Sequence, residues 1–285
     1  MRHIFRKAFK YKTCFAITLS MLLSLASVSC MTAGLIAQAT SAKKGIGEYG
    51  QPHAANTLLD SRVAWYYDWQ PTSDVPNPPA DIQFIPMIWG ERNLNAADEA
   101  AAKNSGSGIL LTFNEPDNAG QSNMTVAQAL AAWPQLEALN MTLGSPAVSD
   151  DATNPNGWLA QFMAGAKAAG YRVDFICIHS YQSNFDPQIA TQNLLKYLDT
   201  VHKMYKLPIW VTEYAMGYWP SSQGVTPPYP IQATFAAVSG PALEKLQYVQ
   251  RYAWYSDTPN QPSWSAYNTD GTETAVGAAW RKVPK

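Results

Sequence analysis

Short apolar runs alternate with amphipathic segments along most of this chain. Eight runs predict strands, at residues 45–49, 63–69, 82–89, 109–115, 142–147, 173–180, 208–213 and 251–255. Many are continuously apolar, which is typical of parallel strands that are covered on both faces. Helical spacing predicts helices at residues 54–61, 95–103, 125–139, 157–169, 187–205, 233–250 and 272–282. Alternating strands and helices predict an α/β fold, here a single (β/α)8 TIM barrel.

The second helix of this repeating pattern is missing. Four prolines fall within residues 70–79, and proline interrupts a helix because it lacks a backbone N–H and clashes with the preceding turn. We therefore expect a Pro-rich loop in place of that helix. A second irregular stretch, residues 218–230, follows the seventh predicted strand. Loops that leave the carboxyl ends of strands build the active sites of barrel enzymes.

The first 39 residues differ from the rest of the chain. A basic start without acidic residues precedes the apolar stretch 14–25, and Ala37-Gln38-Ala39 offers a small-x-small cleavage site. This pattern predicts a secretory signal peptide over residues 1–39, followed by one catalytic domain over 43–285. A membrane anchor is the alternative, although serines interrupt the stretch, and a lipoprotein linkage at Cys30 stays open. We expect a secreted, extracellular protein, with a periplasmic or wall-associated location as variants.

The net charge disfavours some classes of binding partner, and the cysteine content excludes internal disulfide bonds. The leader holds five of the 20 basic residues and none of the 21 acidic ones, so the remainder has a formal charge of about −6. A negative surface disfavours nucleic acid and anionic lipid, whereas a neutral polymer is not repelled. Cys177 is the only cysteine outside the leader, so the mature chain has no internal disulfide. We expect a monomer that makes no membrane contact after cleavage.

Two glutamates stand at the ends of apolar runs. Glu115 closes the fourth predicted strand and Glu213 the seventh, 98 positions later. The carboxyl ends of parallel barrel strands meet at one rim, so the two carboxyl groups should face one site. Glycoside hydrolysis needs such a pair, one to protonate the leaving oxygen and one to attack the anomeric carbon or activate water. Glu48 and Asp68 also end strands, as further site acids or as hydrogen-bond partners.

Neighbouring residues suit the same reaction. Pro116 predicts an extended backbone at Glu115, and apolar surroundings together with ionised Glu213 predict a raised pKa for Glu115. Asn114 could bind a sugar hydroxyl. His179 or Tyr181 could donate a hydrogen bond to the nucleophilic carboxylate. Flat aromatic faces on which a pyranose can stack are offered by Trp69, Trp89 and Trp254, among others.

Other chemistries find little support. Residues 45–50 match G-x-G-x-x-G, but no strand precedes the first glycine, as a dinucleotide-binding fingerprint requires. H-E-x-x-H, paired C-x-x-C and G-x-S-x-G motifs are absent from the sequence. We therefore expect no metal and no cofactor.

Several segments together resemble the catalytic core of glycoside hydrolase family 128, a (β/α)8 group of retaining β-1,3-glucanases and related glucan-binding proteins. They run in order over nearly all of the chain after the leader: Trp65-Tyr66-Tyr67-Asp68-Trp69, residues 84–90, Phe113-Asn114-Glu115-Pro116-Asp117, Gly144-Ser145-Pro146-Ala147, His179-Ser180-Tyr181, residues 210–215 and Arg251-Tyr252-Ala253-Trp254.

The resemblance implies roles for five residues. Glu115 is the acid/base, Glu213 the nucleophile, and Asn114 contacts the 2-hydroxyl of the sugar. Tyr181 orients the nucleophile, and Trp254 floors the subsite next to the cleaved bond. Where many members have an aromatic residue, this chain has Ser180, and Asp68 replaces an asparagine, so subsite shape and endo- or exo-action stay open.

The expected activity is a secreted, retaining endo-β-1,3-glucanase that cleaves β-glucan polysaccharide or oligosaccharide by double displacement. One alternative is a related glycosidase that acts on β-1,4-mannan or β-1,4-glucan, which would keep both glutamates. The other is a non-catalytic β-glucan-binding wall protein, which would keep the aromatic residues without needing the acids.

Overall fold

The computed structural model describes residues 42–149, 151–219, 224–257 and 263–284. The predicted leader, residues 1–39, lies outside the described residues, so the signal peptide stays a prediction. Within the described part, no helix combines the length and apolar character that crossing a membrane requires.

All eight predicted strands are present, most of them shorter than predicted. They are β1 (Lys44–Gly47), β2 (Trp65–Tyr67), β3 (Gln83–Phe84), β4 (Ile109–Leu110), β5 (Thr142–Leu143), β6 (Ile176–Gln182), β7 (Ile209–Met216) and β8 (Val249–Trp254). Six form a sheet in the order β3-β2-β1-β8-β7-β6, and β4 pairs with β5. Every one of these pairings is parallel.

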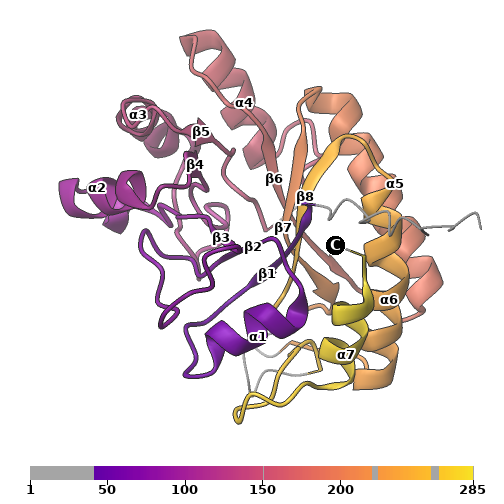
Figure 1. Cartoon of the computed structure of the whole chain (residues 1–285). Helices are drawn as coiled ribbons and strands as arrows, with labels where there is room; N and C mark the ends of the chain where they lie inside the picture. Colours follow the sequence, from indigo (N-terminus) through magenta and orange to yellow (C-terminus); the bar gives the residue numbers. More distant parts are fainter. Residues whose placement is uncertain (1–41, 150, 220–223, 258–262, 285) are drawn as a thin grey trace, which may run out of the picture. The chain divides into compact units, whose positions relative to one another are not determined.

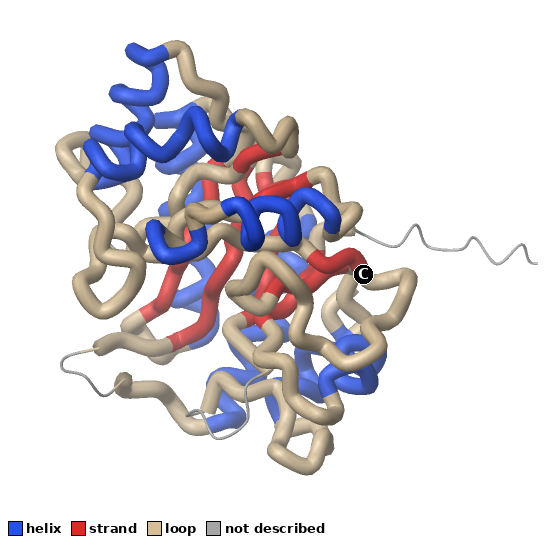
Figure 2. Tube along the Cα trace, turned by 90° about the vertical axis from the view of Figure 1, so that its left-hand side faces the viewer, coloured by secondary structure: helices blue, strands red, loops and turns tan. Residues whose placement is uncertain are grey.

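Isolated bridges connect the two sheets. Met87 pairs with Leu111 beyond the ends of β3 and β4, and Gly144 pairs with Phe175 between β5 and β6. The eight strands therefore follow a circular order like that of a TIM barrel, with single bridges instead of continuous ladders at two places. Figure 2 shows the strands in the interior of the described part, with helices and loops around them.

Seven α-helices follow the strands around this arrangement (Figure 1). They are α1 (Ala54–Ser61), α2 (Ala96–Asn104), α3 (Val126–Glu137), α4 (Trp158–Ala169), α5 (Pro187–Tyr205), α6 (Tyr229–Glu244) and α7 (Ala275–Lys282). Local sequence signals fix two helix starts, since Thr125 begins α3 in a capping box and Asp186 accepts hydrogen bonds from the first turn of α5. The described residues 68–82 contain no helix, as the prolines predict.

The predicted bounds of α6 were wrong. The helix begins four residues earlier than predicted, because Pro228 and Pro230 lie at its cap and first turn, where proline needs no N–H partner. It also ends six residues earlier, at Glu244, and residues 249–250 belong to β8. Lys43 Nζ donates to the carbonyl oxygens of Glu244 and Leu246, at 2.9 and 3.0 Å, and so satisfies the end of the helix.

Side chains alternate between two apolar layers along each strand. On β2, Trp65 and Tyr67 point into the strand ring with Met87, Phe175 and Trp210, whereas Tyr66 packs outward. On β8, Tyr252 and Trp254 pack outward against the helices, and Ala253 points inward. This period of two decides which strand-end residues reach the site.

Candidate active site

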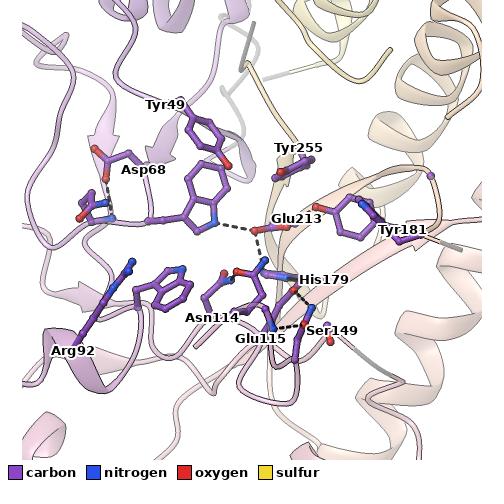
Figure 3. Close-up of a pocket in the computed structure, with 18 of the residues that line it drawn as sticks. Tyr49, Asp68, Arg92, Asn114, Glu115, Ser149, His179, Tyr181, Glu213 and Tyr255 are labelled. Atoms are coloured by element: carbon purple, nitrogen blue, oxygen red, sulfur yellow. Dashed lines mark hydrogen bonds and ion pairs between the residues drawn. The ribbon is translucent and has the colours of Figure 1, made fainter. Parts of the chain in front are cut away.

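A cleft of about 950 Å³ lies at the carboxyl ends of the strands. Figure 3 shows its floor, where side chains from several strand ends converge. The residues that line it are Tyr49, Asp68, Trp69, Gln70, Asp74, Trp89, Arg92, Asn114, Glu115, Asn118, Gly120, Gln121, Ser149, His179, Tyr181, Glu213, Gly217, Tyr218, Trp219 and Tyr255.

Glu213 lies on β7, opposite His179 of β6 in the strand register. Its carboxylate accepts three hydrogen bonds, from Trp69 Nε1 at 2.9 Å, Tyr181 Oη at 2.5 Å and Tyr67 Oη at 3.3 Å. Donors arranged in this way fix the position of a carboxylate and favour its charged form. The carboxylate of Glu213 is therefore held on both oxygens within the barrel.

Glu115 follows β4 and is 9% exposed. Its backbone N–H donates to Ala147 O at 2.7 Å. The extended backbone that Pro116 predicted is wrong, because Glu115 has a φ of 42° in the left-handed region. A non-glycine residue in that region is strained, and such strain gathers at functional sites. The surrounding hydrogen bonds hold this turn against the preference set by the proline.

His179 lies between the two glutamates. Its Nδ1 is 2.9 Å from Glu115 Oε1, and its Nε2 is 3.5 Å from Glu213 Oε1. One oxygen of each glutamate and one imidazole nitrogen all lie within 4.8 Å of one another. The remaining oxygen of Glu115 accepts from Asn118 Nδ2 at 3.2 Å. An imidazole therefore bridges the carboxyl pair, which the sequence had not indicated.

The sequence predicted a raised pKa for Glu115, but the contact with His179 shifts this pKa in the opposite direction. Burial alone would raise this pKa, but the hydrogen bond and charge of His179 together lower it below its ordinary value. Burial would lower the pKa of His179, yet the charges of Glu213 and Glu115 raise it. Burial, and to a lesser degree Glu115, raise the pKa of Glu213. These shifts favour an ionised Glu115 beside a protonated imidazole.

An imidazole with two carboxylates is also a donor set that could hold a metal ion. Glu213, however, already accepts hydrogen bonds from Trp69, Tyr181 and Tyr67 within the protein. His179 likewise directs Nδ1 at Glu115 within hydrogen-bond distance. These contacts suit proton transfer between the three groups, and we assign no metal to them.

Trp69 lies under the nucleophile. Its φ of 59° is unusual for a tryptophan, and it turns the indole so that Nε1 reaches Glu213. The ring passes directly over Gly47 of β1, where an added Cβ would lie 2.7 Å from Trp69 Cη2. Gly47 therefore provides the space that lets Trp69 take this position.

Asn114 and Trp89 reach the cleft as the sequence predicts. Asn114 Nδ2 donates to Gln121 Oε1 at 3.1 Å, and its Oδ1 is buried with no partner among the described residues. A buried amide oxygen without a partner, on a residue that lines the cleft, is an available acceptor for a hydroxyl. The guanidinium carbon of Arg92 lies 4.0 Å from the centre of the Trp89 ring, so this ring is braced on one side.

The expectation that Trp254 floors a subsite is not met. Trp254 is fully buried in the layer between strands and helices, and its Nε1 donates to Trp264 O at 2.8 Å. The next residue, Tyr255, has the inward orientation and lines the cleft instead. Strand parity explains the exchange, because Ala253 and Tyr255 share one face of β8 and Trp254 the other.

The roles left open for two other acids are now defined. Asp68 lines the cleft and also accepts the backbone N–H groups of Gln70 and Asp74, so it holds the Pro-rich loop. Burial raises the pKa of Asp68 to about 7. Glu48 is fully buried, does not line the cleft, and pairs with Asp257.

Sequence reasoning did not single out several cleft residues. Arg92, Asn118, Gln121 and Ser149 come from loops or a short 3₁₀ turn, whose conformation follows no apolar period. Tyr255 could have been found from the inward and outward alternation of β8. Trp219, in the stretch after β7, was by contrast among the aromatic residues expected to offer a face to a sugar, and it lines the cleft with 46% of its surface exposed.

The fold and the paired acids define a class of enzyme. A family model described as "Glycosyl hydrolase catalytic core" matches residues 45–280. The chain is a glycoside hydrolase.

Solved structures narrow the class further. A glycoside hydrolase family 128 (subgroup I) endo-β-1,3-glucanase from Amycolatopsis mediterranei, in complex with laminarihexaose, is 40% identical over 85% of this chain and 100% of its own, with a TM-score of 0.82. Structures of that enzyme include substitutions at two different glutamates. A subgroup II endo-β-1,3-glucanase from Sorangium cellulosum is 27% identical over 85% of this chain and 99% of its own, with a TM-score of 0.70.

A curated relative, Alkali-sensitive linkage protein 1 of Schizosaccharomyces pombe, is 26% identical over 209 residues. These residues cover 71% of this chain and 36% of that protein, so the chain spans only part of the relative's length. The resemblance seen in the sequence is confirmed, and the chain belongs to glycoside hydrolase family 128.

Proposed function

We propose that this protein is a secreted, retaining endo-β-1,3-glucanase in which Glu213 is the nucleophile and Glu115 the acid/base. The observation that carries the proposal is the bridged pair, in which an oxygen of each carboxylate lies within 4.8 Å of the other. Retaining glycosidases separate their carboxyl groups by about 5–5.5 Å, whereas inverting ones leave about 6.5–9.5 Å for a water molecule. The β-1,3-glucan specificity is supported by the relatives that act on this polymer.

In the first step, a Glu213 oxygen attacks the anomeric carbon and the glycosidic bond breaks. Glu115 gives its proton to the departing oxygen, leaving a glycosyl ester on Glu213. In the second step, Glu115 removes a proton from water, which attacks the same carbon and releases Glu213. The hydrogen bonds from Trp69, Tyr67 and Tyr181 orient the attacking carboxylate and then stabilise it as it leaves.

His179 accounts for the proton that Glu115 needs. The contacts favour a proton on the imidazole and an ionised Glu115 before substrate binds. Moving that proton across the 2.9 Å contact from Nδ1 to Glu115 Oε1 yields the acid without changing the total charge. Substrate that expels water from the cleft disfavours a separated ion pair and so favours the neutral imidazole and the protonated acid.

The aromatic lining of the cleft suits a glucan chain. Trp89, braced by Arg92, and Trp219 offer flat faces against which the C–H groups of a pyranose can pack. Asn114 also lines the cleft, and its Oδ1 has no partner among the described residues, so it is an acceptor for a sugar hydroxyl. This arrangement supports binding of several sugar units across the catalytic pair. No described residue of the cleft requires a charged substrate.

Replacing the nucleophile tests the reaction. Glu213→Gln keeps the side-chain volume but removes the attacking charge, so we expect laminarin hydrolysis to fall by about four orders of magnitude or more. Glu99→Gln, a glutamate of α2 outside the cleft, is the matched control and should hydrolyse laminarin like the wild type. A Glu213→Gln enzyme that cleaves laminarin at the wild-type rate contradicts the assignment.

A substrate panel tests the specificity. Laminarin and curdlan should be cleaved, and mannan and carboxymethyl-cellulose should not. NMR of the first-formed product should show the β-anomer if configuration is retained. Cleavage of mannan instead would support the alternative specificity, and binding of laminarin without cleavage would support the glucan-binding wall protein. Amino-terminal sequencing of the exported protein tests the predicted leader.

A further inference from the structure

A second pair of buried carboxyl groups lies beside the cleft and has no part in the reaction above. Glu48 follows β1 and Asp257 follows β8, and their exposed fractions are 0% and 2%. The two carboxyl groups lie within hydrogen-bonding reach of each other, and each has a buried oxygen with no partner among the described residues. Because an ionised carboxylate only accepts, a hydrogen bond between them requires a proton on one of the two groups. Two buried carboxyl groups in this contact are therefore best accommodated with one shared proton.

The surroundings supply donors but no compensating cation. Tyr49 N–H donates to Glu48 Oε1 at 3.0 Å, and Thr57 Oγ1 donates to Asp257 Oδ2 at 3.4 Å. Glu48 Oε2 and Asp257 Oδ1 have no donor from any other described residue, which leaves them for the shared proton. Neither group forms an ion pair with a Lys, Arg or His in the described part of the chain.

The titratable neighbours are also uncharged or acidic. Tyr49 feels the charge of Asp257, and Tyr66 of β2 feels that of Glu48. Backbone N–H groups of Gly50 and Gln51 face Glu48 as well. Loss of the shared proton would therefore place two negative charges in contact within a buried space, with only neutral dipoles to offset their repulsion.

The pair connects the segments that carry one side of the cleft. Asp257 N–H donates to Gly47 O at 3.1 Å, next to Glu48. The adjacent cleft residues are Tyr49 and Tyr255, one on each segment, and their side chains face each other. We call these two residues the tyrosine wall. Figure 3 shows both near Glu213.

The tyrosine wall contacts the groups that hold the nucleophile. The Tyr49 ring lies 4.5 Å from that of Trp69, and the Tyr255 ring lies 5.4 Å from that of Tyr181, edge to face. Trp69 and Tyr181 are two of the donors to Glu213. A displacement of the wall would therefore change both the cleft surface and the support of the nucleophile.

Resting on the proposed function, we propose that Glu48 and Asp257 are positioning residues of the glucan-binding cleft. Their shared proton holds the tyrosine wall against the donors of Glu213, and loss of this proton at alkaline pH loosens the wall and weakens glucan binding. This assigns a function to two acids that never touch the substrate.

Binding of laminarihexaose to the Glu213→Gln enzyme, measured by calorimetry from about pH 6 to about pH 9.5, tests the proposal. With the pair intact, Kd should rise on the alkaline side. Adding Asp257→Asn should flatten this rise, because the amide N–H replaces the shared proton permanently. Adding Asp257→Ala should weaken binding at every pH by about 3- to 30-fold, a usual range for coupling through packed neighbours. Asp81→Asn, an exposed acid on a loop, should leave the pH dependence of the background unchanged.

Two results would overturn the proposal. One is an equal alkaline rise in Kd with and without Asp257→Asn. The other is unchanged binding by an Asp257→Ala protein that still melts cooperatively. If Asp257→Ala does not fold, the Asp257→Asn comparison decides alone.

An infrared measurement separates this proposal from the proposed function. The pH-difference spectrum of the ligand-free Glu213→Gln enzyme should show a protonated carboxyl group that is lost at alkaline pH and missing after Asp257→Asn. If that signal is present but no glucan binds, the proposed function fails and the shared proton stands. If the signal is missing while glucan binds, the function stands and this proposal fails.

Discussion

Two pairs of buried carboxyl groups solve the same electrostatic problem in different ways. Between Glu115 and Glu213 lies the imidazole of His179, whereas Glu48 and Asp257 bond to each other directly. Burying two negative charges side by side is unfavourable in both places. One pair gains a cation, and the other keeps a proton.

The difference follows what each pair must do. The imidazole can return its proton to Glu115 and so lets that carboxyl group alternate between acid and base. The direct pair has no such exchange partner, and its proton serves to hold two chain segments together. A reactive pair therefore needs a mobile proton on a neighbour, while a positioning pair needs a proton that stays.

Replacing one acid of the reactive pair should have the largest effect. Glu115→Gln cannot protonate the leaving oxygen, and we expect kcat on laminarin to fall by about 10²- to 10⁴-fold. A substrate with an activated aryl leaving group needs no proton and should lose far less in its first step. Glu48→Gln makes the same chemical change in the other pair and should act mainly on KM. An equal loss of kcat in both variants would abolish the distinction between the pairs.

The Glu48–Asp257 pair should affect how the stability of the folded protein changes with pH. Burial, together with Glu48, raises the pKa of Asp257 well above its ordinary value of 3.8, so the folded state binds more protons than the unfolded one. Stability contributed by this proton is full below the unfolded pKa and is lost as pH rises toward the folded pKa.

Asp257→Asn should remove this loss of stability with rising pH. Between pH 5 and pH 7 the variant should gain stability relative to the wild type, by at most about 1.4 kcal/mol per pH unit, the limit set by one extra bound proton. Melting curves at both pH values check it, with Asp81→Asn as the control. A Tm difference that stays constant with pH would mean that the pair holds no extra proton.

Replacing His179, which lies between Glu115 and Glu213, should have a smaller effect, visible in the pH dependence of kcat/KM. His179 lowers the pKa values of both Glu115 and Glu213. In His179→Asn the acidic limb of kcat/KM should therefore move to higher pH. A variant that is slower but keeps the wild-type limb would show that His179 only packs against the pair.

The order of strands and helices could be predicted because it depends on local signals. Continuous apolar runs marked all eight strands, and prolines marked the missing helix. The error at α6 has a local cause as well. Apolar spacing continues past Glu244, but the contact of Lys43 with the end of the helix is made by a residue some 200 positions away. Such a contact leaves no trace in a single window of sequence.

The site was predictable in its acids but not in its electrostatics. Glu115, Glu213, Asn114 and Tyr181 reach the cleft because they lie at strand ends. The orientation of His179 toward both glutamates depends on a register shift between Ile178 and His179, which the sequence does not announce. The sequence predicted that Trp254, and not Tyr255, lies in the cleft. Choosing between two adjacent aromatic residues requires knowing which face of the strand each side chain occupies.

Gly47 has no functional group, yet the indole of Trp69 occupies the space that a Cβ at this position would need. Any side chain there must displace the ring whose N–H holds Glu213. In a deep mutational scan for glucan hydrolysis, Gly47 would therefore be as intolerant as a reacting residue, although the folded yield of Gly47→Ala could stay high. If such a library were sorted by activity alone, Gly47 would be classified as a catalytic residue, although its role is to leave space for the Trp69 ring.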